Sequence, residues 1–218
     1  MAKRNFNQTF SKSLEGTFRK KGVVMQPSDE ELMLSIKCGD DSAFEVLTHR
    51  HYANTLNFIY RFVGNRELAE DLCQDTFVRL WRSAPNYRPI AKFTTFLYCI
   101  AKNVCLKELA KIQKFPLVSS LDEPLSEDVN YDLYTVTEEV EDGRYTPENS
   151  VLNQELSRKI QEAIASLSSD HRLVFILTEY HGMSYQEVAD IVQCPVGTVA
   201  SRKNAAVRKL RKMLSQYR

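Results

Sequence analysis

The chain has 218 residues, enough for one large domain or two small ones, and it is 43% apolar and 26% charged, as soluble globular proteins are. The longest apolar run of its C-terminal half, residues 173–177, is too short to cross a bilayer, so we expect no membrane insertion. Its five cysteines are scattered, odd in number and without a CxxC pair, which argues against a disulfide framework and favours reduced thiols in a cytoplasm. The basic N-terminus lacks the apolar stretch of a secretory signal, and a mitochondrial-type transit peptide remains the alternative interpretation.

The charges are distributed unevenly along the chain, although the formal net charge is only +1. Residues 1–22 carry six basic residues and one acidic residue, whereas residues 116–150 carry ten acidic residues and one basic residue. The acidic segment also holds three prolines and has no helical period, which is typical of a linker. The sequence therefore predicts four segments: a basic N-terminal extension at 1–27, a body at 28–115, an acidic flexible linker at 116–150 and a second body at 151–218.

Almost everything outside the linker has the pattern of helices. A capping box at Ser28 and Glu31 opens the first helix, which is expected to end near Cys38. Apolar pairs recur at helical spacing beyond it, and no stretch shows a confident strand period. We expect further helices at 41–63, 66–81, 93–113, 151–166, 170–180, 184–193 and 196–214. The predicted fold class is all-α, with two small helical domains joined by the linker.

The C-terminal body contains two amphipathic helices on either side of a tight turn at Cys194 and Pro195. The second of these helices is polar and basic near its start, and seven basic residues without an acidic one lie between Ser201 and Arg218. This arrangement is typical of a helix-turn-helix, in which the second helix enters the major groove of DNA. A merely solvated basic face is the simpler alternative.

The N-terminal body offers two surfaces of different chemistry. Asp71, Gln74 and Asp75 lie opposite the apolar stripe of their helix, and such an acid-and-amide face suits docking on a basic or amide-rich protein surface; ordinary surface charge is the alternative. The second surface interleaves basic side chains with aromatic rings, a pattern that suits binding of a single strand. It comprises the loop residues Asn86, Tyr87, Arg88, Lys92 and Phe93 and a row down the following helix, Asn103, Lys107 and Lys111.

Two long stretches resemble one known family. Residues 165–214 resemble region 4 of extracytoplasmic-function (ECF) sigma factors, through "RLVFIL", "GMSYQEVA" and "PVGTVASR"; residues 65–109 resemble region 2, through "AEDLCQDTFVRLW" and "FTTFLYCIAKN". Departures from the family pattern occur at Ser168, Ala200, Ala205 and Val207 in region 4 and at Phe96, Lys107 and Ala110 in region 2. Because of Lys107 and Ala110, a −10 sequence preference cannot be transferred from the family.

The resemblance implies a role for each candidate surface. The acid-and-amide face would clamp a coiled coil of the RNA polymerase core, the loop would capture a flipped base of the −10 element, and the helix after it would contact the adjoining duplex. The −35 element would be recognised by Thr198, Ser201, Arg202, Lys203 and Asn204, with Arg208 among the residues supplying further contacts. The linker of the family threads the RNA exit channel, and anti-sigma proteins are common partners.

The predicted function is therefore promoter recognition and strand opening as a dissociable subunit of bacterial RNA polymerase. We expect no enzymatic activity, no cofactor and no metal, because the four histidines lack ligand spacing and no glycine-rich phosphate loop occurs. Two alternatives from other classes are a stand-alone repressor or response-regulator output domain, and a nucleic-acid enzyme. The first gives region 2 no role, and the second would need a paired-carboxylate or metal constellation, which the sequence lacks. We also hypothesise that the acidic linker shields the basic tail in the free protein.

Overall fold

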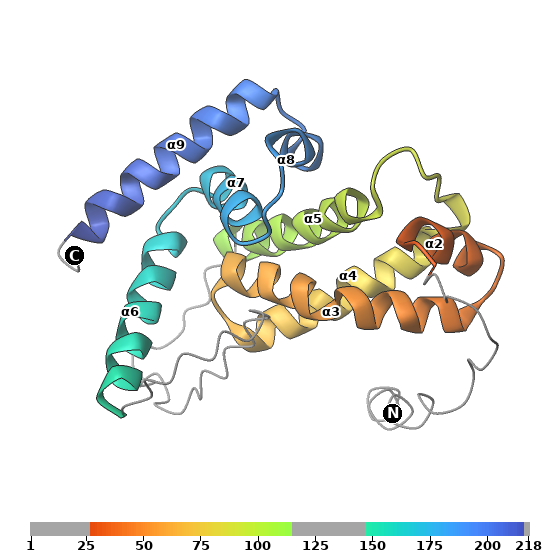
Figure 1. The fold of residues 1–218 in the computed structure, drawn as a ribbon, viewed down its shortest axis with the longest axis horizontal. Coiled ribbons are helices and arrows are strands. Elements are labelled where there is room, and N and C mark those ends of the chain that lie inside the picture. The colour runs from red at the N-terminus through yellow and green to blue at the C-terminus, as the bar shows by residue number, and fades with distance from the viewer. Residues whose placement is uncertain (1–26, 115–146, 216–218) are drawn as a thin grey trace.

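The computed structural model of the protein describes residues 27–114 and 147–215, and these residues form helices joined by short turns, without a strand (Figure 1). An N-terminal module and a C-terminal module follow one another along the chain. The N-terminal module comprises α2 (Asp29–Lys37), α3 (Asp41–Val63), α4 (Arg66–Ser83), the 3-10 turn η1 (Ala84–Asn86) and α5 (Phe93–Lys114). The C-terminal module comprises α6 (Pro147–Ala165), α7 (Ser169–Glu179), α8 (Tyr185–Val192) and α9 (Val196–Met213).

The all-helical fold predicted from the sequence is confirmed. The main difference lies at α6, which begins at Pro147, four residues inside the predicted linker. Proline is well accommodated at the first position of a helix, because a backbone N–H at that position would have no acceptor within the helix. The predicted extension at 1–27, apart from its last residue, and the linker from 116 to 146 lie outside the described residues.

Local signals in the sequence set the ends of several helices. Both predicted capping boxes form: Ser28 with Glu31 opens α2, and Ser184 with Glu187 opens α8. Each serine hydroxyl accepts from a backbone N–H of the first turn, which would otherwise have no partner. At the other end of α3, Gly64 adopts a left-handed conformation with φ of 80°, which glycine reaches without a Cβ clash.

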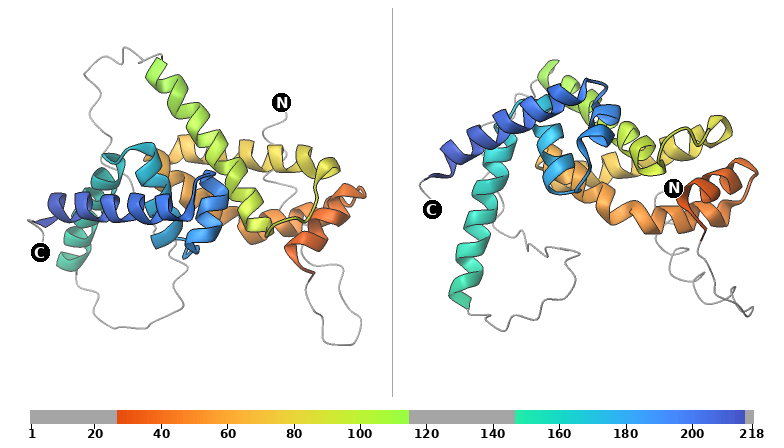
Figure 2. Two further views of the ribbon diagram at one scale, coloured as in Figure 1. Left: turned by 90° about the horizontal axis from the view of Figure 1, so that it is seen from above. Right: turned by 45° about the horizontal axis from the view of Figure 1, so that its top comes forward.

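The N-terminal module is a small bundle. Helices α3, α4 and α5 pack against one another, and α2 packs against one end of α3 and against η1 (Figures 1 and 2). Its interior contains the fully buried rings of Phe58 and Phe62, and the thiols of Cys73 and Cys105. Burial raises the pKa of each of these two thiols to about 12, so both remain protonated at neutral pH.

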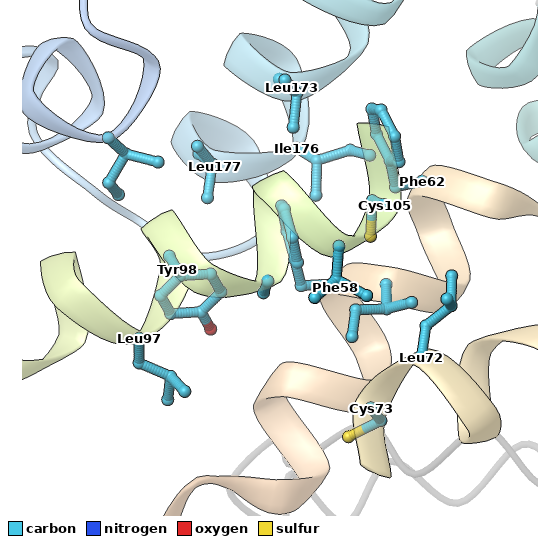
Figure 3. Close-up of a cluster of buried hydrophobic side chains, with 14 of the residues drawn as sticks. Phe58, Phe62, Leu72, Cys73, Leu97, Tyr98, Cys105, Leu173, Ile176 and Leu177 are labelled. Carbon is cyan, nitrogen blue, oxygen red and sulfur yellow. The ribbon is translucent and has the colours of Figure 1, made fainter. Parts of the chain in front are cut away.

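The two modules share one continuous apolar core. Leu173, Ile176 and Leu177 of α7 lie against the same cluster as Phe58 and Tyr98 from α3 and α5 (Figure 3). In addition, α8 packs beside α5. The modules of this structure are therefore docked on each other rather than held apart.

None of the helices in the described ranges is long and apolar enough to cross a membrane. Within the same residues, no group of histidine, cysteine and acidic side chains is placed to hold a metal ion.

Candidate nucleic-acid interface

The helix-turn-helix predicted from the sequence is formed by α8, a tight turn and α9. Gln193 ends α8 in the left-handed region with φ of 56°, and the Cys194 N–H donates to the Ala189 carbonyl at 3.2 Å. The Pro195 carbonyl then accepts from the Thr198 N–H at 2.8 Å, which starts α9. Buried Val188 and Val199 lie on either side of the turn, so the angle between the two helices is set by core packing.

The residues predicted to contact the −35 element fall into two groups on α9. Ser201, Asn204 and Arg208 are exposed, and their spacing of three and four residues places them on one face of the helix. Thr198 is half-buried, and its carbonyl accepts from the Ser201 hydroxyl at 3.0 Å. These four residues form the part of the predicted surface that is free to meet DNA in this conformation.

The other two predicted residues make ion pairs inside the module. Arg202 reaches Asp170 at the start of α7 at 2.6 Å, and Lys203 reaches Glu179 at its end, also at 2.6 Å. The Glu179 carboxylate raises the pKa of Lys203, which also lies over the Tyr185 ring at 5.3 Å. Arg202 and Lys203 therefore also hold α9 against α7. The sequence analysis missed both acids, because their partners lie more than twenty residues away with no local signal.

The loop between η1 and α5 displays its basic side chains and buries its rings. Arg88 and Lys92 are exposed, whereas Tyr87 is only 4% exposed and Phe93 only 1%. Neither ring can stack on a DNA base in this conformation, so the predicted role of both rings requires the loop to rearrange. Ile90, which the sequence analysis did not single out, is 87% exposed and is the large hydrophobic side chain that the loop does present.

The remaining residues of the predicted −10 surface are accessible. Asn86 is exposed at the end of η1, and Asn103, Lys107 and Lys111 are exposed along α5. Their four-residue spacing brings them onto one face of that helix, as predicted. Lys111 also pairs with Glu108 at 2.6 Å, a surface contact that contributes little to stability.

The acid-and-amide face of α4 is also accessible. Asp71 and Gln74 are exposed, and half-buried Asp75 pairs with Arg79 one turn further at 2.9 Å. Val78 follows on the same side of the helix and is 45% exposed. The face is therefore a short acidic and polar strip with an apolar end, which suits docking on a basic protein surface.

Comparison with known proteins identifies the family. The Sigma-70 region 2 family matches residues 47–115, and the Sigma-70, region 4 family matches residues 157–210. The ECF RNA polymerase sigma-E factor of Haemophilus influenzae is 34% identical over 181 residues, which cover 83% of this chain and 92% of that protein. The chain belongs to the ECF RNA polymerase sigma factors. It is a promoter-recognising transcription initiation factor that acts with RNA polymerase.

Other comparisons agree with this assignment. The RNA polymerase sigma-H factor of Pseudomonas aeruginosa is 31% identical to this sigma factor over 83% of its length and 90% of the relative. Among solved structures, CnrH in complex with the cytosolic domain of CnrY has a TM-score of 0.63 at 23% identity, covering 87% of this chain and 99% of that one. The sigma factor RpoE of Bartonella quintana, solved with the anti-sigma factor NepR, has a TM-score of 0.60 at 22% identity, covering 80% and 98%. At these identities the two structures support the fold.

In this sigma factor, α5 of the N-terminal module holds α8 of the helix-turn-helix. The Lys102 ammonium, only 7% exposed, donates to the Ile191 carbonyl in the last turn of α8 at 2.8 Å. A cation at a helix C-terminus stabilises the carbonyls that have no helical donor. Lys92, in the loop before α5, pairs with Glu187 of α8 at 2.6 Å. The hydrogen bonds from Lys92 and Ser184 lower the pKa of Glu187 to about 2.

The C-terminal module in turn holds the end of α3. Arg172 donates to the Phe62 carbonyl at 2.6 Å, and Gln161 donates to the Arg61 carbonyl at 3.2 Å. The Arg61 guanidinium lies over the Tyr180 ring at 3.6 Å from its centroid. The modules therefore satisfy each other's helix C-termini, which replaces the water that would solvate these carbonyls in separated modules.

His181 sits between the modules. Its ring lies 5.8 Å from that of Phe58, and its Nδ1 is hydrogen-bonded to the Tyr98 hydroxyl at 2.9 Å. Burial, with a smaller effect from the Arg61 charge, lowers the pKa of His181 to about 4. The imidazole is therefore neutral when the modules are docked at neutral pH.

Proposed function

We propose that this sigma factor divides promoter recognition between its modules. Residues 151–218 bind the −35 duplex through α9, and residues 28–115 bind the polymerase core and the opened −10 region. The observation that carries the proposal is the presence of two separate exposed polar surfaces, one on α9 and one on α5 with its preceding loop. A single duplex-binding module would need only the first.

The −35 contact rests on the exposed face of α9. Asn204 and Ser201 can form hydrogen bonds with base edges, while Arg208 adds a positive charge for the phosphate backbone. Arg202 and Lys203 have to exchange Asp170 and Glu179 for phosphates if they are to join them. That exchange replaces one partly exposed ion pair by another, so its cost is small.

The −10 contact rests on the loop and on α5. Lys107 and Lys111 can follow the phosphates of a strand, and the exposed Ile90 can contact an unstacked base or a thymine methyl group. Opening costs a few kcal/mol per unstacked step, and contacts made only by the open strand offset that cost. The polymerase is contacted through Asp71, Gln74 and Asp75.

Docking of the modules bears on regulation. Lys92, one of the predicted −10 residues, is paired with Glu187 of α8 in the docked form, and Lys102 joins α5 to the Ile191 carbonyl of the same helix. Freeing Lys92 for DNA while α9 binds the −35 element therefore requires the modules to separate. We infer that the core polymerase provides the competing contacts. We also propose that an anti-sigma protein binds this chain in the cytoplasm of its bacterium, by analogy with the RpoE–NepR pair.

Sequencing of transcripts made in vitro tests the proposal. Core RNA polymerase, genomic DNA and the purified chain should give defined 5′ ends with two shared upstream motifs. The double variant Ser201→Ala, Asn204→Ala should lose the preference at the distal motif. Core polymerase that ignores the chain would contradict the proposal, as would tight and selective binding of one site by the chain alone, which a stand-alone repressor would show.

A further inference from the structure

The loop that displays Arg88, Ile90 and Lys92 is held at both ends by α2. At its first end, the Tyr87 carbonyl accepts a hydrogen bond from the Lys37 ammonium at 3.2 Å. The Tyr87 ring is buried and lies 5.4 Å from that of Phe96. Residues 88–92 are all exposed, so the chain leaves the core immediately after this anchor.

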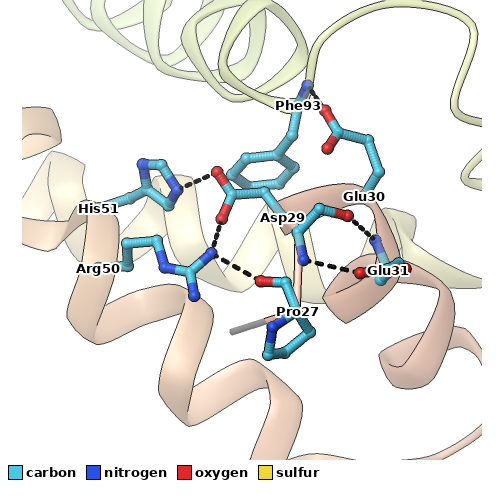
Figure 4. A network of polar contacts seen from close by, with 8 residues as sticks. Pro27, Asp29, Glu30, Glu31, Arg50, His51 and Phe93 are labelled. Carbon is cyan, nitrogen blue, oxygen red and sulfur yellow. Dashed lines mark hydrogen bonds and ion pairs between the residues drawn. The ribbon is translucent and has the colours of Figure 1, made fainter. Parts of the chain in front are cut away.

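At the other end, the loop returns to the core at Phe93, the first residue of α5. The Glu30 carboxylate accepts the Phe93 N–H at 2.7 Å (Figure 4). This amide is one of the first-turn donors that have no helical acceptor, and a carboxylate at a helix N-terminus is favoured by the helix dipole. The Phe93 ring is buried and lies 5.1 Å from that of His51.

Helix α2 is itself fixed to α3. The Asp29 carboxylate pairs with Arg50 and, at 2.7 Å, with His51 (Figure 4). Leu32, Met33 and Ile36 of α2 are buried. The two anchors of the loop therefore come from a helix with its own ion pair, hydrogen bond and core contacts. That helix lies before residue 47, outside the stretch that matches Sigma-70 region 2.

We propose that Glu30 and Lys37 are positioning residues for −10 recognition. They fix the two ends of a five-residue loop, so that Arg88, Ile90 and Lys92 meet the opened strand in one arrangement. The inference rests on the proposed role of this loop in −10 binding. A short loop with fixed ends has few conformers, so little entropy is lost when it binds, and one base sequence is preferred over others.

Substitutions at the two anchors separate positioning from folding. Glu30→Ala removes the acceptor, Glu30→Gln keeps an acceptor without the charge, and Lys37→Met keeps the apolar stem without the donor. Lys37→Arg retains a donor, and Glu45→Ala removes an exposed acid of α3 as a matched control. Thermal unfolding and hydrogen exchange at the Phe93 amide report on the free chain.

The deciding readout is selection by the holoenzyme from promoters with a fixed −35 element and randomised −10 bases. Glu30→Ala and Lys37→Met should lower enrichment of the wild-type −10 sequence about tenfold, as expected when a hydrogen bond to a charged group is lost. Glu30→Gln should give an intermediate enrichment, and Lys37→Arg and Glu45→Ala should enrich the −10 sequence as the wild type does. Hydrogen exchange at the Phe93 amide should be faster in Glu30→Ala.

Unchanged −10 enrichment in Glu30→Ala and Lys37→Met would overturn the inference, even if both variants melted at lower temperature. If Glu30→Ala fails to fold, the enrichment of the wild-type −10 sequence by Glu30→Gln and Lys37→Met decides the question. A wild-type holoenzyme that enriches no −10 sequence would instead overturn the proposed function, and the inference with it.

Discussion

Tyr87 shows how burial changes the role expected of a single residue. Its position in a basic loop predicts that the ring contacts a DNA base. In the structure the ring is buried, and its hydroxyl has no hydrogen-bond partner among the described residues. Burial, with the nearby charges of Glu30 and Asp29, raises the pKa of this hydroxyl. Removing an unsatisfied buried hydroxyl costs nothing, so Tyr87→Phe should leave thermal stability unchanged or raise it by up to ~1 kcal/mol, with unchanged −10 affinity. A loss of −10 affinity in Tyr87→Phe would instead mean that the hydroxyl leaves the core to meet DNA.

At the scale of an element, α4 combines a core stripe with a polar outer face. Because the outer face carries exposed Asp71 and Gln74, the double variant Asp71→Asn, Gln74→Ala should keep the fold. Loss of charge-assisted contacts should weaken binding to core polymerase about tenfold or more, ~1.4 kcal/mol. Fluorescence anisotropy of the labelled chain against core enzyme measures this loss, with Asp190→Asn on α8 as an acid of the other module. If both variants bound core polymerase equally well, α4 would not be the docking helix.

At the scale of the whole molecule, the docked state should depend on pH through His181. Its pKa is about 4 when docked and near 6.5 when exposed, so separated modules bind more protons between these values. Docking is therefore fully stabilised above pH 6.5 and weakens as pH falls toward 4, by about 2 kcal/mol at pH 5. Small-angle scattering should show a larger radius of gyration at pH 5 than at pH 7. The increase should be absent in His181→Gln. It should be retained in the control His49→Gln, because the His49 side chain is exposed. An equal increase in both variants would contradict the assignment to His181.

Local patterns in the sequence are sufficient to predict the helices but not to predict how the helices dock on one another. Capping boxes at Ser28 and Ser184, the glycine after Val63 and the proline at 195 each act within a few residues, so helix ends could be predicted closely. The docking of α8 on α5 depends on Lys102 meeting a carbonyl 89 residues away, which no local pattern encodes. The same applies to Glu30, whose capping role at α5 spans 63 residues.

The candidate surfaces show the same division. Residues on one helix face, such as Asn103 with Lys107 or Ser201 with Asn204, could be grouped from spacing alone. The two loop rings could not be assigned correctly to the surface or the core, because loops have no period that separates an inner from an outer side.

Footprinting of one promoter tests the division of labour between the modules most directly. Holoenzyme with the wild-type chain should protect the −35 duplex and expose reactive thymines near −10. The double variant Lys107→Ala, Lys111→Ala should lose the reactive thymines and keep −35 protection. The double variant Ser201→Ala, Asn204→Ala should lose −35 protection. Loss of both signals together in each double variant, with core polymerase still bound, would contradict the account.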